Sequence, residues 1–189
     1  MVENQFGHHL NPDDFFRGMA NEHPIAQGDT ILRGNYFEGD INQEELEELI
    51  GLSKSISEKG EMVRNPLLLW PNGEVPYVIS SSINSQERGI IASAMAEFHE
   101  KTCIKFVPRV NQNDYIHIVK KDGCWAVIGR SGNVQEVSLG GGCVHKGIVQ
   151  HEFMHVIGMS SFKKIYPFFS IITQPFLEQL LLLFSRILA

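Results

Sequence analysis

The residues with the clearest chemical potential are His151 and His155, which stand four positions apart, with Glu152 directly after the first. On a helix, residues four apart lie on one face, so both imidazoles could approach a Zn²⁺ ion at about 2.0–2.1 Å. The Glu152 carboxylate would then reach a water molecule in the open coordination position and act as a general base. Zinc lowers the pKa of its bound water towards about 7 and polarises a carbonyl. This H-E-x-x-H pattern therefore predicts zinc-dependent hydrolysis of peptide bonds.

An alternative interpretation needs no metal. The two histidines could be hydrogen-bonded core residues of a buried amphipathic helix. The helix has a separate apolar face, which consists of Val149, Phe153, Val156 and Ile157. This face could pack against the core without the imidazoles, which favours the zinc interpretation.

The motif continues to Gly158, and the eight positions from His151 match the start of the longer metzincin signature. In that signature the glycine permits a turn that brings back a third histidine. The third position here is Ser161, whose hydroxyl is a poor zinc ligand, and no histidine follows His155. The methionine turn expected further on is absent. Glu178 is an alternative third ligand, because some zincins take a downstream glutamate. The sequence thus predicts two good protein ligands where catalytic zinc usually has three.

The motif needs a helix, predicted from Lys146 to Ile157, and a scaffold of mixed α and β structure. A second helix is expected after Ser85 as its cap, because apolar residues then recur at helical spacing. Isolated among these elements, His99, His117 and His145 are interpreted as structural or surface residues. Short β-rich runs separated by turn residues predict strands at 75–80, 102–107, 114–120, 124–128 and 134–139.

The N-terminal third has a different character. Residues 1–34 are polar without a sustained period, which predicts a loop or extended arm, and their acidic start lacks the order of a secretory signal. Asn42 and Glu45 make a capping box and Gly60 a stop, so we expect a helix over 43–57 and an exposed linker over 60–66.

Charge divides the chain at the same place. Residues 1–64 carry 13 acidic and 5 basic side chains, whereas residues 65–189 carry 9 acidic and 11 basic ones. The net charge of -6 provides no basic field for polyanions, so we expect no nucleic-acid partner. The longest run without charged side chains is 13 residues, Ile165–Leu177, short of the roughly 18 that a membrane-spanning helix needs.

Six segments carry a resemblance to a known family: Phe37–Asp40, Leu69–Pro71, Val75–Tyr77, Thr102–Phe106, Asp122–Trp125 and His151–Gly158. Through them the chain resembles the astacin metalloproteases over about residues 35–159. The resemblance implies an α+β fold: a metzincin N-terminal subdomain, with a twisted mixed sheet and two long helices, after a pro-segment. It also implies a secreted endopeptidase that binds one Zn²⁺ through His151 and His155, uses Glu152 as base and acts on peptides or proteins.

The same resemblance implies a zymogen. Residues 1–64 would be the pro-segment, in which Asp40 of the F-x-G-D motif occupies the water position of zinc. Arg64 would be the activation site for a trypsin-like protease. From the residues alone, Asp40 could instead be a turn aspartate after Gly39, and Arg64 a solvated linker charge.

The three cysteines form an odd set, which in an oxidising compartment leaves one without an internal partner. The resemblance pairs Cys124 with Cys143 and leaves Cys103 as a free thiol. The alternative is that all three are reduced core cysteines of a cytosolic protein.

The likeness stops after Gly158. We therefore expect residues 65–159 to be the N-terminal half of the catalytic domain, its C-terminal subdomain to be missing, and residues 160–189 to be a divergent apolar tail. The catalytic activity should then be weak or nil. The alternative function is a non-catalytic secreted module that binds peptides.

Overall fold

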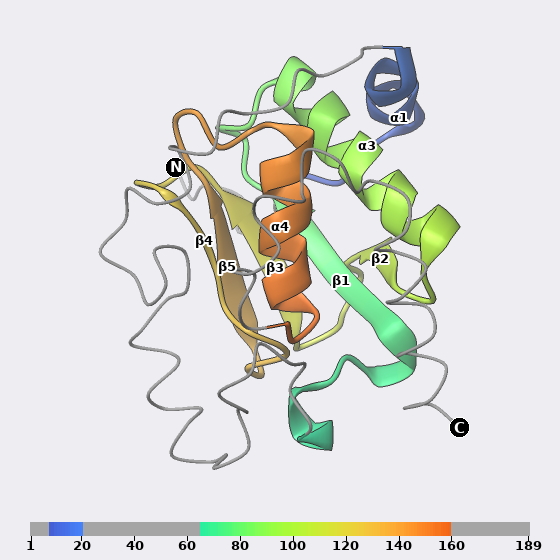
Figure 1. The fold of residues 1–189 in the computed structure, drawn as a ribbon, viewed down its shortest axis with the longest axis vertical. Helices are drawn as coiled ribbons and strands as arrows, with labels where there is room; N and C mark the ends of the chain where they lie inside the picture. The colour runs from blue at the N-terminus through green and yellow to red at the C-terminus, as the bar shows by residue number, and fades with distance from the viewer. Residues whose placement is uncertain (1–7, 21–64, 160–189) are drawn as a thin grey trace, which may run out of the picture.

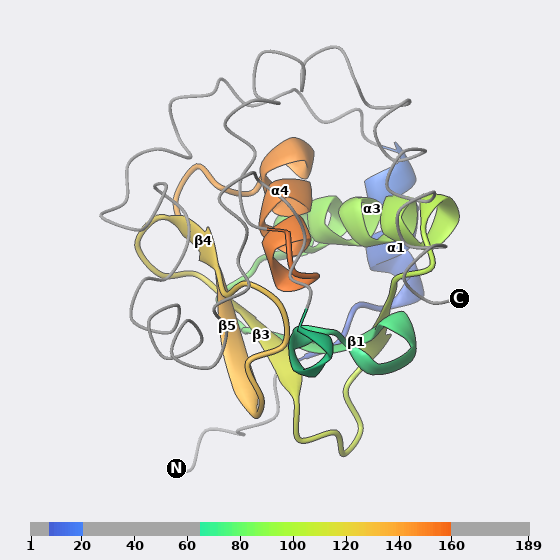
Figure 2. The ribbon, with the colours of Figure 1, turned by 60° about the horizontal axis from the view of Figure 1, so that its bottom comes forward.

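The computed structural model describes residues 8–20 and 65–159. These residues form a five-stranded sheet with two helices, α3 (Ser85–Lys101) and α4 (Lys146–Val156), on one of its faces (Figures 1 and 2). Several predictions fall outside the described residues: the helix at 43–57, Asp40, Arg64, Ser161 and the tail at 160–189.

The sheet is mixed, with strand order β2-β1-β3-β5-β4. Four neighbouring strands are parallel and β4 pairs antiparallel with β5 at one edge. Because parallel neighbours need a crossover, α3 lies between β1 and β2 in the chain. The predicted α+β class is thereby confirmed. The strands are β1 Glu74–Ile79, β2 Lys105–Pro108, β3 Tyr115–Val119, β4 Cys124–Ala126 and β5 Val134–Leu139, and two short 3₁₀ turns, η2 Pro66–Leu68 and η3 Pro71–Gly73, precede them.

Helix α3 spans Ser85–Lys101, and its cap differs from the prediction. Asn84, not Ser85, is the N-cap: its side chain accepts from the backbone N–H of Gln86 and of Glu87, while the Glu87 carboxylate accepts from the Asn84 N–H. An asparagine with a glutamate three residues later satisfies two orphan N–H groups, which Ser85 could not do from inside the first turn.

The strand predicted at 102–107 begins later, at Lys105. Thr102 ends α3 instead: its backbone N–H and its hydroxyl both donate to the carbonyl of Phe98, and the same hydroxyl accepts from the N–H of Ile104. This local bonding holds Thr102 out of the strand.

The core lies between the sheet and the two helices. Phe98 of α3, Phe106 of β2 and Phe153 of α4 meet there, with ring centroids 4.5 to 6.2 Å apart. Trp70 and Trp125 are buried as well. Helix α4, Lys146–Val156, is therefore attached to the sheet through its apolar side chains.

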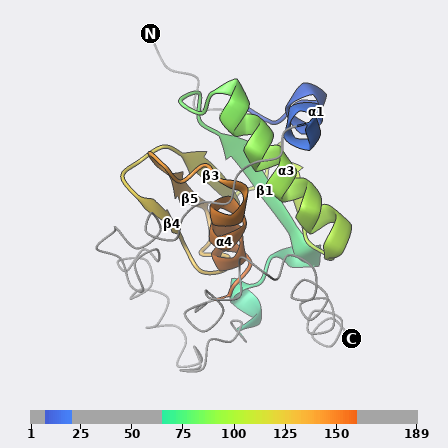
Figure 3. The same ribbon diagram turned by 45° about the horizontal axis from the view of Figure 1, so that its top comes forward.

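The N-terminal prediction was wrong at one place. Within the segment expected to be loop or extended arm, Pro12–Ala20 forms the helix α1. Asn11 and Asp14 bond reciprocally, each side chain accepting from the other's backbone N–H, and Pro12 occupies the first helical position. Asn-Pro-x-Asp is a start signal for a helix, but α1 is too short for periodicity to reveal it. Figure 3 shows α3 between α1 and α4.

Cys124 and Cys143 form the disulfide that the resemblance implies. Cys103 is exposed and forms no disulfide with another described residue. Across residues 8–20 and 65–159, none of the helices has the length and apolar character needed to cross a membrane.

Candidate metal centre

Helix α4 places the two predicted ligands on one side of one helical turn. The Nε2 atoms of His151 and His155 lie 3.1 Å apart, and the rings are perpendicular, with centroids separated by 4.7 Å. Two nitrogen ligands held 2.0–2.1 Å from a tetrahedral zinc ion are about 3.4 Å apart. The pair therefore fits a shared zinc ion with a shift of a few tenths of an ångström.

The second ring nitrogen of His155 determines which tautomer it adopts. Nδ1 lies 2.7 Å from the carbonyl oxygen of Met159. A carbonyl oxygen only accepts, so Nδ1 carries the proton and Nε2 keeps its lone pair, the form that binds a metal. Such an outer hydrogen bond also fixes the ring orientation of a metal ligand.

Gly158 makes this contact possible. The chain leaves α4 with Gly158 at φ +98°, the Gly158 N–H donates to the His155 carbonyl, and the Met159 N–H donates to the Met154 carbonyl. This is a Schellman ending, which needs a residue at positive φ and favours glycine. It turns the Met159 carbonyl back towards the imidazole of His155.

The C-terminal end of α4 is held by groups far away in the sequence. The indole Nε1 of Trp70 donates to the Val156 carbonyl at 2.8 Å, and the Gly129 N–H donates to the His155 carbonyl at 2.9 Å. The side-chain amide of buried Gln135 donates in turn to the Gly129 carbonyl at 2.8 Å. These bonds satisfy the last carbonyls of α4 and fix the position of His155.

Glu97 of α3 holds the other end of α4. One of its carboxylate oxygens, Oε2, lies 2.7 Å from Lys146 Nζ and accepts from the Gln150 amide at 2.8 Å; Oε1 accepts from Lys101 at 2.6 Å. Burial works to raise the pKa of Glu97, but the hydrogen bonds from Lys101 and Lys146 outweigh it and the pKa is lowered. The ionised carboxylate thus links α3 to the turn of α4 that precedes His151.

Burial alone does not separate the metal interpretation from a core interpretation. Every residue from Ile148 to Gly158 is buried except Gln150, including His151 and His155, and Glu152 has no exposed surface. The separate apolar face expected for α4 is therefore not distinguished by its burial. The two Nε2 atoms converge at a distance that suits a shared ion and also an N–H···N hydrogen bond from His151. The Nδ1 contact of His155 with Met159, which leaves Nε2 with its lone pair, is the second observation that favours the metal interpretation.

The three histidines interpreted as structural or surface residues do not join this pair. His99 accepts a hydrogen bond from the Phe106 N–H through Nε2, and His117 lies within β3. His145 precedes α4 and makes no side-chain cap. In the described part of the chain no group of three His, Cys, Asp or Glu side chains is arranged to hold a metal.

A comparison with protein families identifies this arrangement. The model of the peptidase family Astacin matches residues 62–163, more than half of the chain. The chain belongs to the astacin family. The helix that carries His151, Glu152 and His155 lies inside the matched region.

Two nematode relatives and one solved structure illustrate the similarity of this astacin to known proteins. Zinc metalloproteinase nas-15 of Caenorhabditis elegans is 39% identical over 166 residues, covering 79% of this chain and 29% of that protein. Zinc metalloproteinase nas-4 of the same nematode is 41% identical over 160 residues, covering 79% and 49%. The solved structure of high choriolytic enzyme 1, a hatching enzyme zinc-protease from Oryzias latipes, is 40% identical with a TM-score of 0.46, covering 57% of this chain and 53% of that chain. The astacin chain spans less than half the length of the two nematode relatives.

Some residues that position the candidate site were not predicted to do so. Trp70 was named only within the segment Leu69–Pro71, and Glu97, Gln135 and Met159 carried no signal. Each acts through a contact between segments distant in the chain or through a backbone carbonyl. A motif of side-chain types does not record such contacts.

Proposed function

We propose that this chain is a zinc-dependent metalloendopeptidase of the astacin type, acting on peptides or proteins. The observation that carries the proposal is the pair of Nε2 atoms 3.1 Å apart, with the His155 tautomer set by the Met159 carbonyl. His151 and His155 would hold the zinc ion, and Glu152 would be the catalytic base.

Bound zinc would supply a Lewis acid and a water molecule of lowered pKa. The residues of the chain do the remaining work. Glu152 would accept the proton of the attacking water and pass it to the amine that leaves. Its buried position, directly after His151, keeps bulk water away from the carboxylate and makes its electrostatic interactions stronger.

We further propose that the protein is a secreted zymogen. Residues 1–64 would be the pro-segment, with Asp40 as the carboxylate that takes the water position, and a trypsin-like protease would cut after Arg64. Residues 65–159 would be the zinc-binding half of the catalytic domain and residues 160–189 a divergent tail. The Cys124–Cys143 disulfide supports secretion, because disulfides persist mainly in oxidising compartments.

The activity of this chain should be weak or nil, since Ser161 stands where a third histidine would complete the zinc ligands. The hydroxyl of a serine is a poor ligand, and a catalytic zinc site usually has three protein ligands. Substituting Ser161→His would then raise zinc affinity and peptide hydrolysis together.

The experiment measures zinc content and peptide hydrolysis after cleavage at Arg64. Wild type should bind one zinc ion per chain. His155→Ala should lose the metal, and Glu152→Gln should keep it but lose any hydrolysis. His145→Gln is the matched control, because it lies just before α4 outside the pair, and it should bind zinc like wild type. Well-folded wild type without zinc would contradict the proposal.

The second candidate is a non-catalytic secreted module that binds peptides. Its support is that the described residues offer two histidine ligands and no cluster of three metal-binding groups. Glu152→Gln separates the candidates, because an enzyme loses hydrolysis whereas a binder keeps its affinity for the peptide.

A further inference from the structure

The side of α3 that faces away from α4 carries the N-terminal helix α1 (Figure 3). We propose that this surface, together with the end of β1, is a docking site for residues 8–20, and that it holds the N-terminal segment on the domain after the chain is cut between residues 21 and 64. The assignment of that cut to zymogen activation rests on the proposed function; the docking itself does not.

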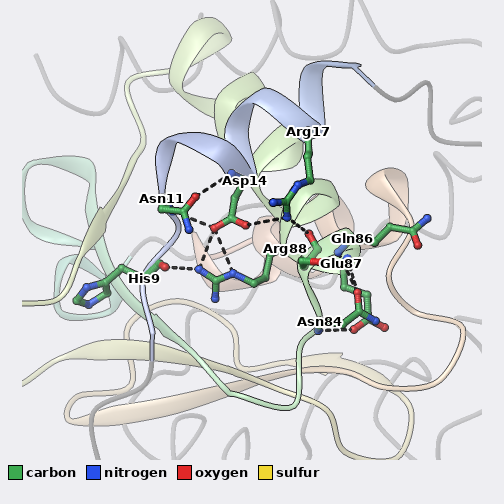
Figure 4. Close-up of polar contacts among 9 residues, drawn as sticks. His9, Asn11, Asp14, Arg17, Asn84, Gln86, Glu87 and Arg88 are labelled. Carbon is green, nitrogen blue, oxygen red and sulfur yellow. Dashed lines mark hydrogen bonds and ion pairs between the residues drawn. The ribbon is translucent and has the colours of Figure 1, made fainter.

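The first contact is an ion pair. The guanidinium of Arg88 donates to Oδ2 of Asp14 from Nε at 3.1 Å and from Nη2 at 2.9 Å, and Nη2 also donates to the carbonyl of His9 (Figure 4). The Asp14 side chain is 2% exposed and that of Arg88 13%. Arg17 of the same helix also lies 4.0 Å from Oδ1 of Asp14, so Asp14 would keep one cation without Arg88. Removing Asp14 would leave the largely buried Arg88 without its carboxylate, so the pair makes the docking specific for this segment.

The same carboxylate shapes the helix that docks. Oδ2 of Asp14 accepts from the N–H of Asn11, and the Asn11 side chain accepts from the N–H of Asp14 (Figure 4). The group that caps α1 is thus the group that binds Arg88. Folding of α1 and its recognition by α3 are therefore coupled.

The second contact is a close approach of the two helices. Gly18 is buried against α3, and a β-carbon added to it would overlap the Gly89 carbonyl oxygen and lie 3.0 Å from the Ser93 nitrogen. Backbone atoms cannot move aside as a flexible side chain would. Only a glycine at position 18 permits this separation of α1 and α3.

The third contact extends the sheet. His8 pairs antiparallel with Ile79 at the end of β1, through two backbone hydrogen bonds of 2.8 Å. Leu10, two residues on, is buried in the main core. Burial raises the pKa of the neighbouring Tyr77 hydroxyl, while a backbone hydrogen bond of Leu10 acts to lower it. Residues 8–10 therefore continue both the sheet and the core.

These contacts all lie within residues 8–20 and the domain that begins at residue 65. A cut between residues 21 and 64 breaks none of them. Cleavage and departure of the N-terminal segment are then two separate events, and the contacts of residues 8–20 slow the second.

The test uses the full chain with a recognition sequence for a site-specific protease inserted next to Arg64. After cutting at micromolar concentration, the N-terminal fragment should co-elute with the domain in size-exclusion chromatography. Asp14→Ala and Gly18→Leu should each raise the release rate tenfold or more. Met19→Ala is the matched control, since Met19 lies on α1 and is 82% exposed, and its release should equal wild type.

Two further measurements keep the outcome decisive. Excess synthetic peptide of residues 8–20 should displace the fragment from the cut wild type, and the same peptide with Asp14→Ala should not. Two results would overturn the docking site. One is that Asp14→Ala and Gly18→Leu leave retention of the fragment unchanged while Asp40→Ala abolishes it. The other is immediate release of the fragment from the cut wild type. Retention should persist in a zinc chelator, so its failure and failure of the zinc proposal are distinguishable.

Discussion

At the scale of the residue, hydrogen bonds decide what each histidine does. His155 donates through Nδ1 to a carbonyl, which leaves Nε2 for a metal, whereas His99 uses Nε2 to accept from a backbone N–H. Both are histidines in helices with neighbouring aromatic or apolar residues. Their chemistry differs because the groups around the rings differ.

The neutral state of His99 makes stability depend on pH. Burial, aided by the charge of Lys105, lowers its pKa below the ordinary value of 6.5. A histidine with a lowered pKa stabilises the fold fully above its unfolded pKa and ceases to do so as the pH falls through its folded pKa. Stability should therefore decline as the solution is acidified below about pH 6.5.

The variant His99→Gln should show a smaller decline in the free energy of unfolding, measured with urea at pH 7.5, 6 and 5. Part of the decline should remain, because burial lowers the pKa of His117 as well. An equal decline in the variant would refute the role assigned to His99. Glu97 does not affect this comparison. Its pKa is lowered from the ordinary value of 4.5, so its contribution to stability is lost only below pH 4.5.

At the scale of the element, α4 is held at both ends by other parts of the chain. Glu97 of α3 bonds its first turns, whereas Trp70 and Gly129 bond its last carbonyls. The proposed pair of zinc ligands inherits its position from these three contacts. Changes outside the H-E-x-x-H motif should consequently affect the metal.

Glu97→Gln should weaken the link between α3 and α4. The neutral amide loses charge-assisted hydrogen bonds, which contribute about 1.5–3 kcal/mol. We expect a loss of that order in the free energy of unfolding, measured with urea at pH 7. Glu100→Gln is the control on the same helix, since Glu100 is exposed, and it should unfold like wild type.

Gly158→Ala should displace the Met159 carbonyl from His155. A side chain at φ +98° costs of order 1–3 kcal/mol, and loss of an outer hydrogen bond lowers metal affinity about 10–100-fold. Titration with a competing chelator measures the affinity. Gly141→Ala, where nothing lies within 4 Å of an added β-carbon, should bind zinc normally. If Gly158→Ala and Gly141→Ala bound zinc with equal affinity, Gly158 would have no role in positioning His155.

At the scale of the whole molecule, one covalent bond joins β4 to the loop before α4. Cys124 and Cys143 are 19 positions apart, with Cα atoms separated by 5.6 Å. A loop of this length restricts the unfolded chain by about 3 kcal/mol. Helix α4 thus begins shortly after a segment attached to the edge of the sheet.

Replacing both Cys124 and Cys143 by Ser should lower the free energy of unfolding by about 3 kcal/mol. Urea unfolding under non-reducing conditions measures it. Cys103→Ser should change stability little, because Cys103 is exposed. A double variant as stable as wild type would show that the bond does not constrain the unfolded state.

The amino-acid sequence by itself determined the local features. Sequence patterns located α3, α4 and the strands, apart from boundaries at Asn84 and Thr102 and the end of β4, which stops at Ala126 instead of residue 128. Residue spacing placed His151 and His155 on one helical face. These features depend on neighbours in the chain, so a linear pattern records them. The helix α1 was missed because its cap signal is short and its stability depends on α3.

Only the tertiary structure decided which distant groups meet. The contact of Trp70 with α4, the bridge made by Glu97 and the docking of Asp14 on Arg88 each join segments whose separation in the sequence has no period. The 3.1 Å between the ligand nitrogens likewise depends on side-chain rotamers that packing selects. Spacing says which residues share a face, but packing and hydrogen bonds determine where that face points.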